Sequence, residues 1–209
     1  MTDTQNLYLF FIASVMLNLT PGNDMLYVMS RTMSQGIKAG VYSAVGIFIG
    51  CFVHITAAIF GLSLIIAESA LLFEIIKFAG AGYLIYLGMK SLLSKSDFGN
   101  DIEKLPSLNT GKLLRQGIVT SALNPKVAIF FLSFLPQFID PAGNYGLQLL
   151  GFGLWFDIQG TLILIFVVFL LGKTRNILKR NRKIIAIQEK ITGIILIILG
   201  IKLALTSRK

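Results

Sequence analysis

The chain has 209 residues, of which 55% are hydrophobic and 14% charged, and its mean hydropathy is +0.76. Soluble proteins carry about 25% charged residues, so this composition excludes an ordinary soluble domain and indicates a polytopic membrane protein. The net charge of +9 does not indicate a nucleic-acid partner, because most basic residues lie in links between apolar segments, where the positive-inside rule accounts for them.

Apolar segments of membrane-spanning length recur along the whole chain. Residues 1–6 contain no Lys or Arg, whereas a signal peptide needs a basic n-region, so we expect the first segment to be retained. A span needs about 20 mainly apolar residues. Six segments meet this requirement: Leu7–Met29, Ala39–Ala67, Leu71–Leu93, Leu113–Leu135, Leu147–Gly172 and Ile184–Leu205. The sequence therefore predicts an all-α membrane protein with six transmembrane helices.

The segments fall into two halves of a single transporter domain, 1–209. A polar connector, 94–111, separates the first half, 1–93, from the second half, 112–209. Each half holds three segments, an odd number, so the second half must have inverted topology. Lys and Arg number 13 in the links after the first, third and fifth segments and four on the opposite side. This bias predicts cytoplasmic basic links and external termini, although the C-terminus moves inside if the sixth segment does not span.

The first apolar segment is interrupted by a polar stretch, Thr20-Pro21-Gly22-Asn23-Asp24. Proline removes a backbone donor and clashes with the preceding turn, and an aspartate held in hydrocarbon costs about 2.5 kcal/mol or more. One interpretation is a simple kink or a short first helix. The other is a broken helix whose exposed backbone groups line a polar substrate site.

The fourth segment carries a second interruption, Asn124-Pro125, followed by Lys126. Interrupted helices at matching positions of two inverted halves point to a binding site near the bilayer midplane. A helix that restarts after each proline presents N–H groups and a positive dipole end that attract carboxylates. Together with carboxylates able to hold an ammonium group, two such ends suit a zwitterion, and an amino acid is the natural candidate.

Among the titratable side chains of the apolar segments, four are candidates for a functional role: Asp24, His54, Lys126 and Asp157. An unpaired ammonium is expensive there, so Lys126 either faces the interior and pairs with an acid or reaches the interface along its own stem. The second acid is then desolvated, which favours its neutral form. We expect Asp24 or Asp157 to carry a coupling proton, against the alternative of a carboxyl that is merely hydrogen-bonded. His54 either relays protons or has a structural hydrogen bond.

Glycines recur along one face of the second segment. Gly46, Gly50 and His54 are spaced four residues apart and share this face. Small residues at this spacing let helix backbones approach closely, so we expect Gly46 and Gly50 to act in helix packing. The lone cysteine, Cys51, excludes an intrachain disulfide and a thiolate metal site.

These motifs resemble the LysE/RhtB family of bacterial amino-acid exporters over nearly the whole chain. The resemblance is carried by Leu19-Thr20-Pro21-Gly22-Asn23-Asp24, by Arg31, Gly36 and Gly40, by Gly46 to His54, by Ser121-Ala122-Leu123-Asn124-Pro125-Lys126 and by Phe134-Leu135-Pro136-Gln137-Phe138. It implies export of amino acids or derivatives driven by the proton gradient. Asn23 departs from the family pattern, where many members have a second proline, and Asp157 is not part of that pattern.

The prediction is an amino-acid exporter of the bacterial inner membrane that works by proton antiport and alternating access, without a cofactor and surrounded by lipid. Efflux of a metal cation or another small solute is the competing transport function, but the chain has one His and one Cys. An intramembrane enzyme would need a nucleophile–base pair or a metal motif, and we find neither. A structural membrane protein would have less reason to bury charges. A monomer and a homodimer both remain open.

Overall fold

All regular secondary structure in the described chain is helical. The computed structural model describes residues 3–62, 70–93, 105–140, 143–178 and 182–205, and no strand occurs among them. The predicted all-helical class is therefore confirmed.

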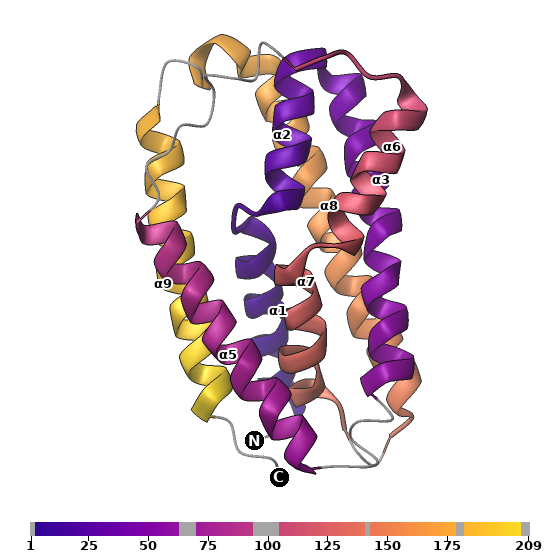
Figure 1. Ribbon diagram of the computed structural model, residues 1–209, viewed down its shortest axis with the longest axis vertical. Helices are drawn as coiled ribbons and strands as arrows, with labels where there is room; N and C mark the ends of the chain where they lie inside the picture. Colours follow the sequence, from indigo (N-terminus) through magenta and orange to yellow (C-terminus); the bar gives the residue numbers. More distant parts are fainter. Residues whose placement is uncertain (1–2, 63–69, 94–104, 141–142, 179–181, 206–209) are drawn as a thin grey trace.

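The first three helices cross the molecule along its long axis and return (Figure 1). Helices α1 (Asp3–Leu19) and α2 (Asn23–Gln35) follow one another from the N-terminal end to the opposite end. Helix α3 (Ile37–Ala57) runs back and continues as a π-helical turn, η1 (Ala58–Leu62). Gly36 joins α2 to α3 with a φ of 89°, a left-handed conformation that glycine adopts without a Cβ penalty.

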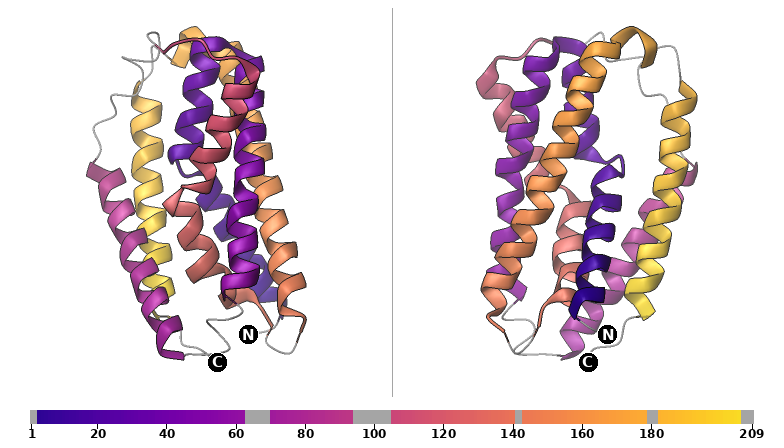
Figure 2. Two further views of the ribbon diagram at one scale, coloured as in Figure 1. Left: turned by 45° about the vertical axis from the view of Figure 1, so that its right-hand side comes forward. Right: turned by 180° about the vertical axis from the view of Figure 1, so that it is seen from behind.

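The second interrupted helix runs in the opposite direction to the first. Helix α6 (Thr110–Ala122) starts at the end of the molecule where α2 finishes, and α7 (Pro125–Ile129) continues toward the other end (Figures 1 and 2). A π-helical turn, η3 (Phe130–Phe134), and a 3-10 turn, η4 (Leu135–Phe138), complete this passage. Interruptions therefore occur at both prolines that the sequence singled out.

The remaining helices are long and uninterrupted. Helix α5 (Ala70–Leu93) packs along α9 (Arg182–Leu205) on one side of the molecule, and α8 (Tyr145–Leu178) packs against α2 and α3. The described part of the basic link after the fifth segment continues α8 to Leu178, because Lys and Arg are good helix formers. The end of the second predicted segment, 63–67, lies outside the described residues.

Two described helices are long and apolar enough to span a membrane, Ile37–Gly61 and Tyr145–Lys173. A third span is added if the bent pair Thr110–Ala122 and Pro125–Phe138 is counted as one. The count of six spans stays a prediction.

Glycines permit the closest helix contacts in the bundle. A Cβ on Gly46 would lie 3.0 Å from the Cα of Gly117, and a Cβ on Gly50 would lie 2.8 Å from the Cβ of Ser121, so α3 and α6 meet almost backbone to backbone. Helices α5 and α9 meet in the same way, since a Cβ on Gly88 would lie 2.6 Å from the carbonyl oxygen of Gly193. Larger side chains at these glycines would force the helices apart.

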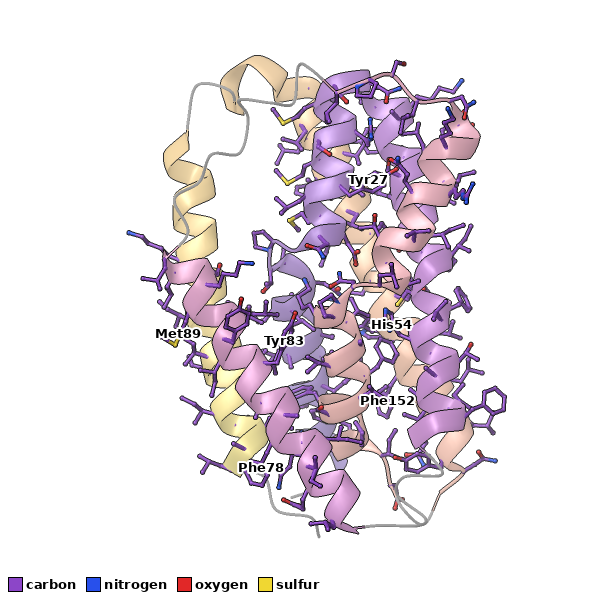
Figure 3. All side chains as sticks on the ribbon, in the orientation of Figure 1. Tyr27, His54, Phe78, Tyr83, Met89 and Phe152 are labelled. Carbon is purple, nitrogen blue, oxygen red and sulfur yellow. The ribbon has the colours of Figure 1, made fainter. Side chains whose placement is uncertain are left out.

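Two apolar clusters lie on either side of the helix breaks. The aromatic cluster occupies the half of the molecule that holds the N-terminus and contains Phe10, Phe130, Phe131, Phe134 and Phe156. The methionine cluster occupies the other half and contains Met25, Met29, Met33, Ile47 and Leu164. His54 and Phe152 lie inside the bundle, whereas Phe78 and Met89 lie on its outer side, more than half exposed (Figure 3).

Polar contacts tie α2 to the segment that enters α6. The buried Arg31 donates from Nη1 to the carbonyl of Pro106 (3.1 Å) and from Nη2 to Oε1 of Gln116 (3.2 Å). Gln35 donates to the carbonyl of Leu108 (2.9 Å) and accepts from its N–H (3.1 Å). These bonds close the bundle at the end opposite the N-terminus.

Candidate functional site

Both helix breaks arise from the residues around a proline. Helix α1 ends at Leu19, and Gly22 precedes α2 in an extended conformation, with φ −151° and ψ −174°. Asn124 is also extended, with ψ 107°, as a residue before proline must be when the helical conformation is disfavoured. The Asn124 side chain accepts a hydrogen bond from the backbone N–H of Lys126 (3.1 Å) and so starts α7.

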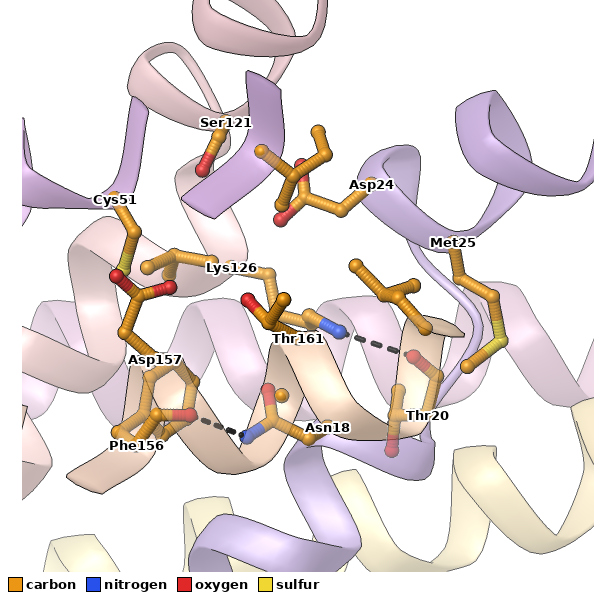
Figure 4. Close-up of a pocket in the computed structure, with 14 residues that line it drawn as sticks. Asn18, Thr20, Asp24, Met25, Cys51, Ser121, Lys126, Phe156, Asp157 and Thr161 are labelled. Atoms are coloured by element: carbon orange, nitrogen blue, oxygen red, sulfur yellow. Dashed lines mark hydrogen bonds between the residues drawn. The ribbon is translucent and has the colours of Figure 1, made fainter. Parts of the chain in front are cut away.

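The two breaks meet through Lys126. Its ammonium group donates to the carbonyl of Leu17 (3.1 Å) and, as Figure 4 shows, to that of Thr20 (3.0 Å), at the C-terminal end of α1. The last carbonyls of a helix lack partners within the helix and carry the negative end of its dipole. Gly22 makes room for this contact, since a Cβ there would lie 3.1 Å from Nζ.

The partner of Lys126 differs from the expected one. The sequence suggested a carboxylate, but Lys126 forms no ion pair with a carboxylate among the described residues. Lys126 is only 9% exposed, so its charge is compensated by the carbonyl end of α1. One of the three ammonium donors is left for a further acceptor.

A small polar cavity lies where the breaks meet. Its volume is about 30 Å³, room for about two water molecules. Its polar lining consists of Asn18, Thr20, Asp24, Ser121, Lys126, Asp157 and Thr161, and its apolar lining includes Met25, Ile47, Cys51, Val127, Phe156 and Leu164. Asp24 and Lys126, which the sequence placed on opposite sides of the chain's midpoint, face the same space.

Several polar atoms of this lining have no partner within the part of the chain that the structure describes. They are Oδ1 of Asp24, Oγ of Ser121, Oδ2 of Asp157 and Oγ1 of Thr161. Buried polar groups are hydrogen-bonded in the great majority of cases, so a cluster of open acceptors around one cavity indicates a surface built to bind something polar.

His54 binds a carbonyl at the C-terminal end of α6, as Lys126 does at the C-terminal end of α1. Its Nε2 lies 2.8 Å from the carbonyl oxygen of Ser121, in the last turn of α6. A carbonyl can only accept, so Nε2 carries the proton of this hydrogen bond. His54 is buried against the ring of Phe131 and does not line the cavity.

The other residues predicted for the site have different positions. Thr20 is buried, and its hydroxyl donates to the carbonyl of Met16 (2.7 Å). Pro21 is half-buried, whereas Asn23 and Pro125 are exposed, and none of these three side chains lines the cavity. Their place in the chain shapes the backbone of the breaks.

The cavity includes residues that sequence reasoning did not assign to it, notably Asn18, Cys51 and Thr161. Asn18 donates to the carbonyl of Phe156 (3.1 Å), and its amide packs on Gly160, where a Cβ would lie 2.8 Å from Oδ1 (Figure 4). Asn18 and Thr161 carried a usable signal, because each is a polar residue within an apolar segment. Cys51 carried no such signal.

The described residues contain no group of three or more His, Cys, Asp or Glu side chains able to hold a metal ion. The two carboxyl groups line the cavity together with an ammonium group, hydroxyl groups and an amide.

Two interrupted helices that meet at a polar cavity inside a helical bundle define a class of membrane transporters. Comparison with known proteins gives the family: the model of the LysE type translocators matches residues 15–207. The chain belongs to this family of translocators, as its motifs suggested, and it is a membrane protein.

Relatives of known name agree with this assignment. The chain is 36% identical over 201 residues to a Bacillus subtilis (strain 168) protein named "Uncharacterized membrane protein YrhP", covering 92% of this chain and 95% of that one. It is 28% identical over 200 residues to the leucine efflux protein of Enterobacter sp. (strain 638), covering 95% of each. It is 30% identical over 135 residues to the leucine efflux protein of Salmonella choleraesuis (strain SC-B67), covering 65% and 64%. No solved structure matches the chain.

Proposed function

We propose that this protein exports neutral aliphatic amino acids such as leucine from the cytoplasm across the bacterial inner membrane. The observation that carries the proposal is the cavity at the meeting point of the two breaks, where an ammonium group and two carboxyl groups share one polar space. An amino acid offers the complementary carboxylate and ammonium groups. The relatives named for leucine efflux support the choice of substrate, and the apolar side chains of Met25, Ile47 and Leu164 suit an aliphatic side chain.

The proposed mechanism is alternating access by two inverted halves with six spans in total. Residues Thr20 to Asp24 form the first half's contribution to the substrate site, and Asn124 to Lys126 form the second half's. A cavity of about 30 Å³ is much smaller than ligand sites of about 300–1,000 Å³, so the proposal requires the halves to move apart. The aromatic cluster would open toward the outside and the methionine cluster toward the cytoplasm.

Proton antiport is the proposed source of energy. Asp24 and Asp157 each have an oxygen in the cavity with no partner among the described residues. A nearby charge changes the balance between the protonated and ionised forms of a carboxyl group removed from water, so a charged ligand that arrives or leaves can displace or recruit a proton there. His54 is the third candidate, although its hydrogen bond to Ser121 favours a structural role.

The test is efflux from proteoliposomes loaded with single amino acids, with and without a pH gradient. We expect leucine to leave fastest and faster when protons can enter in exchange. A protein that moves none of a panel of amino acids in either condition would refute the proposal. Efflux that ignores the pH gradient would refute proton antiport alone.

A further inference from the structure

The two carboxyl groups of the cavity have different electrostatic surroundings. Asp24 lies in the first turn of α2 and faces Lys126, Asn124 and His54. Asp157 faces the Cys51 thiol and, as its charged neighbour, Asp24. Asp157 is 4% exposed, and no cation pairs with it in the part of the chain that the structure describes. A buried carboxylate needs a counterion, and the described residues supply none that pairs with Asp157.

The acceptors around Asp157 form one wall of the cavity. Asp157 and Thr161 are four residues apart on α8 and therefore share a face, and each presents there an oxygen that has no partner among the described residues. Asn18 reaches the same wall from α1, and its donation to the carbonyl of Phe156 turns its Oδ1 toward Gly160. An ammonium group has three N–H donors, and this wall offers three oxygen acceptors of which one is ionisable.

Another part of the cavity has the reverse chemistry. The ammonium group of Lys126 is fixed by two carbonyls of α1 and retains one donor. Next to it lies the start of α2, where Gly22 has no side chain to cap the helix. A carboxylate is favoured at such a helix N-terminus and by the nearby positive charge.

We propose that Asp157, Thr161 and Asn18 form the ammonium subsite for the transported amino acid and that Lys126 with the start of α2 forms the carboxylate subsite. This assignment rests on the proposed function and gives the orientation of the bound amino acid. Its amine lies toward α8 and its carboxylate toward the break in α1. Asp24, which already has a cationic neighbour, is not the amine partner.

Cys51 supplies a direct probe of the ammonium subsite. It is the single cysteine of the chain, it lines the cavity, and its thiol lies against the Asp157 carboxyl group (Figure 4). Cys51 is buried in this structure, so a small cationic methanethiosulfonate labels this one position in proteoliposomes when the halves move apart during transport. Cys51→Ser measures the background.

The experiment compares protection of Cys51 by leucine, by isopentylamine, which lacks the carboxylate, and by 4-methylpentanoate, which lacks the amine. We expect leucine and isopentylamine to slow labelling and 4-methylpentanoate to protect weakly. Asp157→Asn should raise the protecting concentration of isopentylamine about tenfold or more, the effect of losing one charged hydrogen-bond partner. Glu74→Gln, which removes a carboxylate outside the cavity, is the matched control and should leave this concentration unchanged, whereas Asp24→Asn should raise it much less than Asp157→Asn does.

Reversed results would overturn the assignment. These are protection by 4-methylpentanoate but not by isopentylamine, or loss of amine protection in Asp24→Asn instead of Asp157→Asn. If Cys51 does not react at all, stabilisation of the protein against heat by the same three ligands and variants gives the same comparison. Leucine efflux without any preference for the amine in the protection experiment would refute the subsites but not the export function. Amine protection without efflux of any amino acid would refute the export function but not the ammonium subsite.

Discussion

Replacing Gly22 by alanine tests the contact that joins the two breaks. The backbone of Gly22 is extended, with φ −151°, so alanine introduces no backbone strain there. Its Cβ would lie 3.1 Å from Nζ and 3.3 Å from Cε of Lys126. The substitution therefore acts mainly on the position of one ammonium group.

The size of the effect follows from the distances. Comfortable contacts between non-bonded heavy atoms are about 3.5 Å or longer, so the Lys126 ammonium must move by about 0.4 Å. Its bonds to Leu17 and Thr20, now 3.1 and 3.0 Å, would stretch beyond the range of about 2.7–3.2 Å for good hydrogen bonds. Hydrogen bonds to charged groups contribute about 1.5–3 kcal/mol each. Weakening both by about half costs about 1.5 kcal/mol or more.

The assay is a double-mutant cycle on the free energy of unfolding in detergent, with Gly22→Ala, Lys126→Met and the double variant. Alanine is also a poorer helix cap than glycine, by about 0.5–1 kcal/mol, but this cost is the same in both backgrounds. We expect Gly22→Ala to destabilise the native protein by about 2 kcal/mol and the Lys126→Met protein by about 0.5–1 kcal/mol. Equal costs in both backgrounds would show that Gly22 does not act through Lys126.

Three further predictions concern other parts of the structure. Gly46→Ala would press a Cβ against the backbone of α6 and should lower the free energy of unfolding by about 1–3 kcal/mol. The control Gly82→Ala, whose Cβ meets open space, should not lower the free energy of unfolding, and equal melting temperatures of the two variants would contradict this prediction. Asp24→Asn should retain leucine–leucine exchange in proteoliposomes but lose the acceleration by a pH gradient, and an unchanged acceleration would exclude Asp24 as the proton carrier. Arg31→Gln removes two hydrogen bonds at the entry to α6 and should speed hydrogen exchange at the Leu108 amide about tenfold; unaltered exchange would show that the segment is held by other contacts.

The sequence predicted the interruptions because their causes are local. Pro21 and Pro125 lack a backbone donor and restrict the residue before them, whatever the surroundings. It also pointed to Asp24, Lys126 and Asp157 as inward-facing, since a charge in hydrocarbon is too costly to leave against lipid. The structure has all three lining one cavity.

The partners of the basic side chains were beyond the reach of the sequence. Lys126 and His54 each bind main-chain carbonyls at the end of a helix in the other half of the chain. Since every residue has a main-chain carbonyl, the sequence does not mark which one is the partner. Only the tertiary arrangement, which brings Lys126 to the end of α1 and packs α3 against α6, decides which carbonyls come within reach. The π-helical turns η1 and η3 were not predicted either, because their residues have no common sequence signal.

The choice of a carbonyl partner for Lys126 has a consequence for transport. An ion pair between Lys126 and a carboxylate inside the cavity would have to be broken before a ligand's amine could bind that carboxylate, and separating a buried ion pair costs about 3–5 kcal/mol. Since the ammonium group is bound instead by Leu17 and Thr20 at the end of α1, the carboxyl groups keep oxygens free for another cation. The interruption of α1 therefore does more than open space in the bundle. It supplies carbonyl groups that bind the Lys126 ammonium group near Asp24 and Asp157, so that neither carboxyl group has to pair with Lys126.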